Sequence, residues 1–337
     1  MSRSIHITNQ WPLQSQIMSY EYIGVDLATK KLDVCAGGKV YHFANDEDGR
    51  ARFLELVRGT GENALVVYES TGYVSPRFAK FLIGNDIEHK CLNPSWVHYF
   101  ARSKGWLVKT DKKDSRVICE YARSMSVLPD SLYNEFVIEL RSKVSARELL
   151  VKQRAELKTA CHAYRGQNQE KMKALIGSYD EQISTLEKEI KEFILQSEEH
   201  ADLYKVLCSQ PGIGKVLAMV LIAYLPELGK VSGRKIAAIA GLAPYNHDSG
   251  KMAGKRSIRG GRVPLRNTLY VACTACLRMK DWELREHYEK LSKTKAHHVA
   301  MIACCRKVLV RLNARIRDWY KTGCNVTLPR EGSGEAA

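Results

Sequence analysis

The sequence lacks any long hydrophobic run. Its longest, Val216–Leu225, is about half of the roughly 20 residues that a membrane-spanning helix needs, so we expect no membrane partner. The first residues of the chain contain no continuous apolar stretch, so we expect no secretory signal. In the absence of such a signal, the ten cysteines are expected to be reduced thiols. Together these absences predict a cytoplasmic protein.

Acidic residues are scarce in the C-terminal third of the chain. The 337 residues carry a net charge of +15. Residues 205–325 contain 23 Lys and Arg against 7 Asp and Glu, whereas residues 20–125 contain 16 against 14. A basic segment beside a neutral one predicts a polyanion partner, most often nucleic acid. A basic surface that only keeps the protein in solution is the alternative.

Composition and hydrophobic periodicity divide the chain into segments. The length suits two or three domains. We predict an N-terminal extension, an α/β domain, a helical coiled-coil region that holds protomers together, a basic and mainly α-helical domain, and a tail. Their expected bounds are, in that order, residues 1–19, 20–128, 129–204, 205–325 and 326–337.

The first of the folded segments has the pattern of a mixed sheet. Short apolar runs predict strands, and runs with helical spacing lie between the later ones. Gly37-Gly38 is a hairpin signal. Two strands joined by a hairpin and followed by alternating helices and strands indicate a mixed sheet with helices on both faces. The expected strands are Tyr22–Asp26, Leu32–Ala36, Lys39–Phe43, Ala64–Glu69 and Glu88–Leu92, and the expected helices are Asp46–Arg58 and Pro76–Ile83.

The middle segment has heptad spacing. Its apolar residues recur at intervals of three and four, which predicts a long helical hairpin or a helix pair that dimerises. The two apolar seams are Tyr133, Val137, Leu140 and Val144, and then Ile176, Tyr179, Ile183, Leu186, Ile190 and Phe193. The basic segment then opens with Pro211-Gly212-Ile213-Gly214 before an apolar helix. That loop is either a phosphate-binding helix start or a tight turn that leads into a buried helix.

Four acids of the α/β segment are candidate metal ligands. Asp26 and Glu69 each end a predicted strand, and parallel neighbouring strands would bring them to one edge of the sheet. Asp111 and Asp114 are three residues apart at an expected helix start, so they project from one helical face. Such a cluster repels itself unless cations neutralise it, and hard oxygen ligands favour Mg²⁺ or Mn²⁺. Each acid taken alone could instead cap a turn or a helix.

These acids and the sequence around them resemble a known family. The set is similar to the D-E-D-D set of RuvC-like domains with the RNase H fold. Together with motifs in the basic segment, it resembles transposases of insertion sequence family 110, the Piv/MooV-type DNA recombinases. The resemblance covers roughly residues 20–325. The motifs are Ile23–Asp26, Tyr68–Gly72, Asn93-Pro94 and Asp111–Asp114, and then Gln210–Gly214, Gly241–Pro244, Ser249-Gly250 and Arg262–Tyr270.

The resemblance implies a DNA recombinase that acts on donor and target DNA under the guidance of a structured noncoding RNA, the bridge RNA. It implies that Asp26, Glu69, Asp111 and Asp114 bind the divalent metal. It also implies that Ser249 attacks a DNA phosphodiester and forms a covalent phosphoserine link. The resemblance further implies that the protein forms dimers, which pair into a tetramer. It also implies a location in a prokaryotic cytoplasm, in association with the nucleoid. If the active site is assembled from two protomers, Ser249 of one would act with the acids of the other.

Residues near the candidate serine supply positive charge. A serine needs a base or a metal to become a nucleophile, and Ser257 is the second candidate. Basic residues here are expected to bind the phosphates of DNA or RNA: Lys251, Lys255, Arg256, Arg259, Arg262 and Arg266. A second aromatic and basic segment, residues 96–104, either packs on the sheet, which is expected of its aromatics, or contacts a guide RNA. Cysteines 273, 276, 304 and 305 are expected to be buried thiols rather than zinc ligands.

Two other functions remain open from the sequence. The first is a plain RuvC-like nuclease, which would hydrolyse branched DNA with water and need no serine. The second is a basic protein that binds nucleic acid without catalysis. The presence of all four acids argues against a decayed site, and a covalent protein–DNA adduct would distinguish the recombinase from the nuclease.

Overall fold

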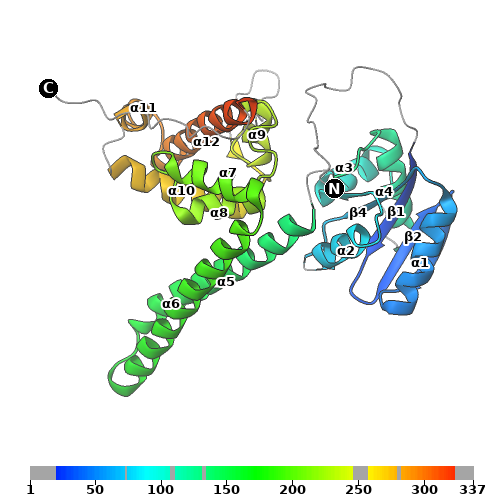
Figure 1. Ribbon diagram of the computed structural model, residues 1–337, viewed down its shortest axis with the longest axis horizontal. Helices are drawn as coiled ribbons and strands as arrows, with labels where there is room; N and C mark the ends of the chain where they lie inside the picture. The colour runs from blue at the N-terminus through cyan, green and yellow to red at the C-terminus, as the bar shows by residue number, and fades with distance from the viewer. Residues whose placement is uncertain are drawn as a thin grey trace. The chain divides into compact units, whose positions relative to one another are not determined.

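A computed structural model describes the chain over residues 20–72, 74–106, 111–130, 134–245, 257–278 and 282–322. For Asp111–Lys113 and Trp282 it describes the backbone alone. The chain forms two compact units that divide between residues 131 and 132 (Figure 1).

The first unit is a five-stranded mixed sheet with helices. The strand order is β3-β2-β1-β4-β5; β1 pairs antiparallel with β2 and parallel with β4. The mixed sheet is therefore confirmed. The strands are β1 (Glu21–Leu27), β2 (Lys31–Ala36), β3 (Lys39–Ala44), β4 (Ala64–Glu69) and β5 (His89–Leu92). The helices are α1 (Glu47–Thr60), α2 (Val74–Ile83), α3 (Pro94–Ser103) and α4 (Asp111–Ser124).

A two-residue turn sets the register of the antiparallel strands. Gly37 and Gly38 have φ angles of 55° and 78°, and positive φ at both central residues is what a tight hairpin turn between twisted strands requires. Ala36 therefore lies opposite Lys39, and the same register places Asp33 opposite His42. On its other side, Asp33 lies opposite Asp26 of β1.

Helices cover both faces of the sheet. On one face, Tyr68 of β4 contacts Phe78 of α2 with a ring-centroid separation of 5.2 Å, and Phe78 contacts Phe53 of α1 at 5.7 Å. On the other face, buried residues of β1, β4 and β5 share a core cluster with Phe100 of α3 and Ile118 of α4. The prediction of a sheet covered on both faces is confirmed.

Helix α4 lies directly against β1. A Cβ atom added at Gly24 would stand 2.3 Å from the carbonyl oxygen of Ser115 and 2.6 Å from the backbone nitrogen of Cys119. The Cys119 thiol also hydrogen bonds to the carbonyl oxygen of Tyr22, at 3.1 Å. From Tyr22 to Gly24 along β1, the contacts move from Cys119 back to Ser115 on α4, so the helix and the strand run in opposite directions. The first turn of α4 consequently points toward the Asp26 end of β1.

The second unit begins with a long helical hairpin, which Figure 1 shows as two helices running side by side. Helix α5 covers Glu135–Cys161 and α6 covers Gly166–Leu195. The two seams meet within one chain, since Leu140 and Val144 of α5 share a buried cluster with Ile190 of α6. The helical hairpin is confirmed, whereas the coiled coil between protomers stays a prediction.

The rest of the second unit packs around one apolar helix. Its members are α7 (Glu198–Ser209), α8 (Lys215–Tyr224), α9 (Gly233–Ile239), α10 (Val263–Arg278), α11 (Trp282–Ser292) and α12 (His297–Lys321), with the short strands β6 (Pro244–Tyr245) and β7 (Ser257–Ile258). The apolar run of the sequence forms α8, where every residue from Leu217 to Tyr224 is buried. In the part of the chain that the structure describes, no helix has the length and hydropathy to cross a membrane.

The cysteines behave as buried thiols. Cys273, Cys276, Cys304 and Cys305 are buried and form no disulfide bond within the described residues, so the prediction of buried thiols is confirmed. Burial raises the pKa of the Cys304 thiol to about 11, which keeps it protonated and unreactive. Cys276 also explains a turn, because a Cβ at Gly212 would stand 2.2 Å from its Sγ atom. The Pro-Gly-x-Gly segment is thus a tight turn packed against α10.

Candidate active site

The first two candidate acids lie on neighbouring strands. Val25 of β1 pairs in register with Tyr68 of the parallel strand β4, so Asp26 and Glu69 occupy the next positions on each strand. Side chains alternate between the faces of a strand. Because Tyr68 points toward α2, Glu69 points toward the face that α4 covers, and Asp26 follows Gly24 on that same face. Both residues are half-buried.

The other two candidate acids belong to α4. The helix begins at Asp111, whose side chain lies outside the described residues, and Asp114 is half-buried one turn later. The structure thus brings Asp26, Glu69 and the start of α4 to one end of one face of the sheet. Among the side chains that are described, no three His, Cys, Asp or Glu form a group able to hold a metal ion, and Asp111 is not among them.

The residue after Asp114 carries a buried hydroxyl. Ser115 is fully buried, and its Oγ atom has no hydrogen-bond partner within the described part of the chain. Unpaired buried hydroxyls are rare because their desolvation costs free energy. Ser115 follows Asp114 directly, so this unsatisfied polar atom lies in the same turn of α4 as one of the candidate ligands.

Asp33 is a fifth carboxylate that the sequence analysis did not identify. It lies opposite Asp26 on β2 and is only 2% exposed. Its carboxylate contacts Nδ1 of His42 at 2.5 Å and Nζ of Lys31 at 3.0 Å. Burial alone would raise the pKa of Asp33, but these two partners outweigh it and hold the pKa below its ordinary value. The row Glu69, Asp26, Asp33 and His42 therefore crosses four adjacent strands on one face.

The candidate nucleophile lies outside the described residues, as do Lys251, Lys255 and Arg256. Ser249 belongs to the segment between β6 and β7, two short strands that pair antiparallel with Tyr245 opposite Ser257. Ser257, the second candidate, is exposed on β7. The two strands thus fix both ends of the segment that contains Ser249.

Two of the predicted nucleic-acid contacts make hydrogen bonds within the protein. The Arg262 guanidinium donates to both carboxylate oxygens of Glu227, each at 2.6 Å, and to the carbonyl oxygen of Tyr224 at 2.7 Å. Arg266 donates to the carbonyl oxygen of Gly260 at 2.7 Å. Arg259 is exposed. Binding of nucleic acid by these three residues stays a prediction, and the first two also stabilise the fold.

We expect Arg262→Ala to destabilise the second unit by up to about 3 kcal/mol, because it would remove the main partner of the half-buried Glu227 carboxylate. Burial alone would raise the pKa of Glu227, but Arg262 outweighs it and holds the pKa below its ordinary value. The pair therefore stabilises the fold above the usual carboxyl pKa of about 4.3, and this contribution is lost as the pH falls through the lowered pKa.

Urea unfolding of the wild type and Arg262→Ala at neutral and acidic pH measures this contribution. The difference in unfolding free energy should be large at neutral pH and should shrink in acid. Arg259→Ala is the matched control, since Arg259 is exposed, and it should change stability by less than about 0.5 kcal/mol. An equal effect of the two substitutions would contradict the assignment.

The aromatic residues of α3 divide between the core and the surface. Phe100 and Val97 are buried in the cluster shared with α4. Trp96 and Tyr99 are 56% and 51% exposed, so the expectation that the aromatics of this segment pack on the sheet is wrong for these two. Val97 and Phe100 are three residues apart and share the helical face that is turned toward the core, whereas Trp96 and Tyr99, also three apart, share a neighbouring face that is exposed.

Two family models match the chain. Residues 23–164 match the DEDD transposase model of IS110, which spans all four candidate acids, and residues 204–289 match the transposase model of the IS116/IS110/IS902 family. Together they match about two thirds of the chain. The chain belongs to the IS110 family of transposases. It is accordingly an enzyme that acts on DNA, and the DEDD match indicates an RNase H-like fold for the first unit.

Individual relatives extend this similarity over most of the IS110-family chain. The pilin gene-inverting protein of Moraxella bovis is 26% identical over 322 residues, which cover 89% of this chain and 97% of that protein. The pilin gene-inverting protein of Moraxella lacunata has the same identity and coverage. An uncharacterised 42 kDa protein of the insertion element IS900 from Mycobacterium paratuberculosis is 33% identical over 119 residues, 34% of this chain and 29% of that protein.

Proposed function

We propose that this transposase cuts, exchanges and rejoins DNA strands with a divalent-metal site in the first unit and a serine nucleophile in the second. The observation that carries the proposal is the placement of Asp26 and Glu69 on adjacent parallel strands, on the face that α4 covers. Asp26, Glu69, Asp111 and Asp114 would hold Mg²⁺ or Mn²⁺. Their hard oxygen atoms fit such ions, which would stabilise the charge that develops on the reacting phosphate.

The proposed nucleophile is Ser249. Its hydroxyl loses a proton as the bond between Oγ and the DNA phosphorus forms. The bond from phosphorus to one deoxyribose oxygen breaks, and that oxygen takes up a proton to become a free strand end. The phosphate ester is conserved on the serine, so the free hydroxyl of another strand can attack it, restore the DNA backbone and release Ser249. No water is consumed and no external energy source is needed.

The proposed acids and the proposed serine belong to different units of the chain. Lys251, Lys255, Arg256 and Arg259 would neutralise phosphates beside Ser249. We further propose a structured guide RNA and a dimer that pairs into a tetramer. The exposed apolar residues of the α5–α6 hairpin, Leu149 and Leu175, support contacts between protomers. In such an assembly, Ser249 of one protomer could act with the acids of another.

DNA inversion is the proposed reaction type, in view of the similarity to the two pilin gene-inverting proteins over almost their whole length. The test is to express the chain in cells that carry its own insertion element and to sequence the nucleic acid that copurifies with it. We expect one discrete noncoding RNA, together with inverted or inserted DNA junctions in the same cells. Junctions without any bound RNA would exclude the guide.

The second candidate is a nuclease that cleaves DNA with water. The acidic row alone favours it, since RuvC-like hydrolysis needs no serine. Denaturation of a reaction stopped before rejoining distinguishes the two. The recombinase leaves DNA covalently attached to the protein, whereas the nuclease leaves free ends.

A further inference from the structure

Helices α9, α11 and α12 of the second unit border a shallow, open cavity of about 640 Å³. Of its eight lining residues none is acidic, and four have basic side chains: Arg234, His287, Arg306 and Lys307. The other lining residues are Ser232, Gly233, Ala303 and Val310. Small side chains among cations leave room for a ligand to approach all of them.

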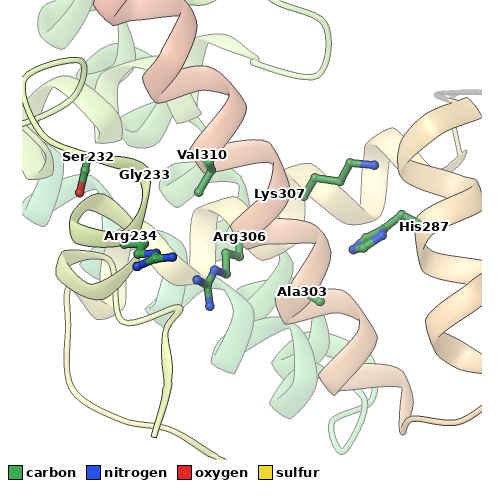
Figure 2. Close-up of a pocket in the computed structure, with 8 residues that line it drawn as sticks. All are labelled: Ser232, Gly233, Arg234, His287, Ala303, Arg306, Lys307 and Val310. Carbon is green, nitrogen blue, oxygen red and sulfur yellow. The ribbon is translucent and has the colours of Figure 1, made fainter.

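The packing of α9 on α12 positions the first pair of cations. A Cβ at Gly233 would stand 2.9 Å from Cγ1 of Val310, so the start of α9 lies directly on α12. Figure 2 shows Arg234 and Arg306 extending into the same part of the cavity. Neither arginine forms an ion pair with a carboxylate of the described residues. Two guanidinium groups therefore face one space without an anion from this part of the protein.

The second pair lies farther along the same cavity. His287 of α11 and Lys307 of α12 extend into the same space between the two helices (Figure 2). Burial, and then the nearby Lys307 and Lys290, hold the pKa of His287 below its ordinary value. The Lys307 ammonium donates to the carbonyl oxygen of Glu283 at 3.5 Å, while the Glu283 carboxylate pairs with Arg311. The charge of Lys307 is thus not cancelled by that carboxylate.

We propose that this cavity is a binding site for the phosphodiester backbone of a nucleic acid. The cations come from three helices and follow an open surface, which suits successive phosphates of a strand. No aromatic residue lines the cavity, so the site lacks a platform for stacking a base. The inference rests on the proposed function only in naming a nucleic acid as the polyanion that binds. It adds a region of contact outside the basic stretch around Ser249.

The test uses the full chain with Arg234→Gln, Arg306→Gln and Lys307→Gln combined. The probes are labelled mixed-sequence DNA and RNA, each as a duplex of about three helical turns and as a single strand. Fluorescence anisotropy at several salt concentrations gives the affinity and its salt dependence. Loss of three phosphate contacts should weaken binding at least about tenfold and reduce the slope of log K against log salt by about 2 to 3.

The matched control removes the same net charge from the exposed side of α6, with Lys171→Gln, Lys173→Gln and Lys188→Gln combined. It should retain the wild-type slope. A variant that exchanges the two residues, Arg306→Lys with Lys307→Arg, keeps both charges. It should retain most of the wild-type affinity, which shows that the loss in the triple variant comes from the missing charges and not from misfolding. A changed slope with RNA alone assigns the site to RNA, and one with DNA alone assigns it to DNA.

An unchanged slope and affinity of the triple variant with all four probes would overturn the inference. The same measurements on an Asp26→Asn background, which carries the cavity intact, keep this question separate from catalysis. Cavity-dependent binding by a catalytically inactive chain supports the site even if the proposed recombination mechanism is wrong. Full recombination together with no effect of the cavity substitutions would leave the mechanism standing and remove the site.

Discussion

Asp26→Asn should reduce strand cleavage and joining by about 10²- to 10³-fold, which is the scale of losing one preorganised electrostatic group in an active site. Asparagine keeps the shape of aspartate but supplies a neutral and weaker ligand. The row on this face also contains Glu69 and the buried Asp33, whose carboxylates lie on the two strands beside β1. Removal of one negative charge from the row should leave the fold intact.

Thermal unfolding with and without divalent metal identifies the cause of that loss. A metal that binds the folded wild type at about 100 times its dissociation constant adds roughly 2.7 kcal/mol to stability. Asp26→Asn should lose most of this gain, while its stability in a chelator should equal or exceed that of the wild type. Glu55→Gln, an exposed change on α1 across the sheet from α4, should behave as the wild type in both assays. Metal-dependent cleavage by Asp26→Asn at the wild-type rate would exclude Asp26 from the site.

The juxtaposition of Asp26 with Glu69 could be predicted from the sequence because it depends on local information. Two short apolar runs each end in an acid. Between them, two hairpin turns bring the chain back to its first direction, and a crossover helix then makes the fourth strand parallel to the first. The carboxyl ends of parallel neighbours then meet at one edge. No further knowledge of side-chain packing is needed to reach that result.

The position of Asp33 beside Asp26 depends in addition on the register of two antiparallel pairings, β2 with β3 and β1 with β2. The Gly37-Gly38 pair is itself a hairpin signal, and a two-residue loop fixes which residues oppose each other. Following that register one strand farther would have placed Asp33 opposite Asp26. The signal was therefore present in the sequence, in an aspartate that interrupts a strand whose other inner residues are apolar.

Long-range pairings could not be predicted in the same way. Arg262 pairs with Glu227 35 residues away, and the basic cavity joins α9, α11 and α12. A run of cations in the sequence does not reveal which of them pairs with a half-buried carboxylate such as Glu227. The distinction depends on how the helices pack around α8, which is fixed by the three-dimensional arrangement of many apolar contacts.

The second large effect is expected at Ser249. Ser249→Ala should abolish the covalent protein–DNA adduct and reduce strand exchange by at least about 10³-fold, because removal of a nucleophile leaves only binding and electrostatic stabilisation. Denaturing gels of reactions with end-labelled DNA measure the adduct directly. DNA binding by the variant should stay at the wild-type level, since the substitution removes no charge. This separates the loss of chemistry from a loss of affinity.

Ser257→Ala is the matched control for Ser249→Ala, since Ser257 is the same residue type on the strand that ends the same segment. It should retain the adduct, and an adduct lost only in Ser257→Ala would reassign the nucleophile. Mixing Ser249→Ala with Asp26→Ala protein then tests assembly between protomers. If the serine and the acids act in trans, a mixed oligomer contains at least one site with both an intact serine and an intact acidic row. Partial recovery of strand exchange is therefore expected, and inactivity of the mixture would mean that each protomer completes its own site.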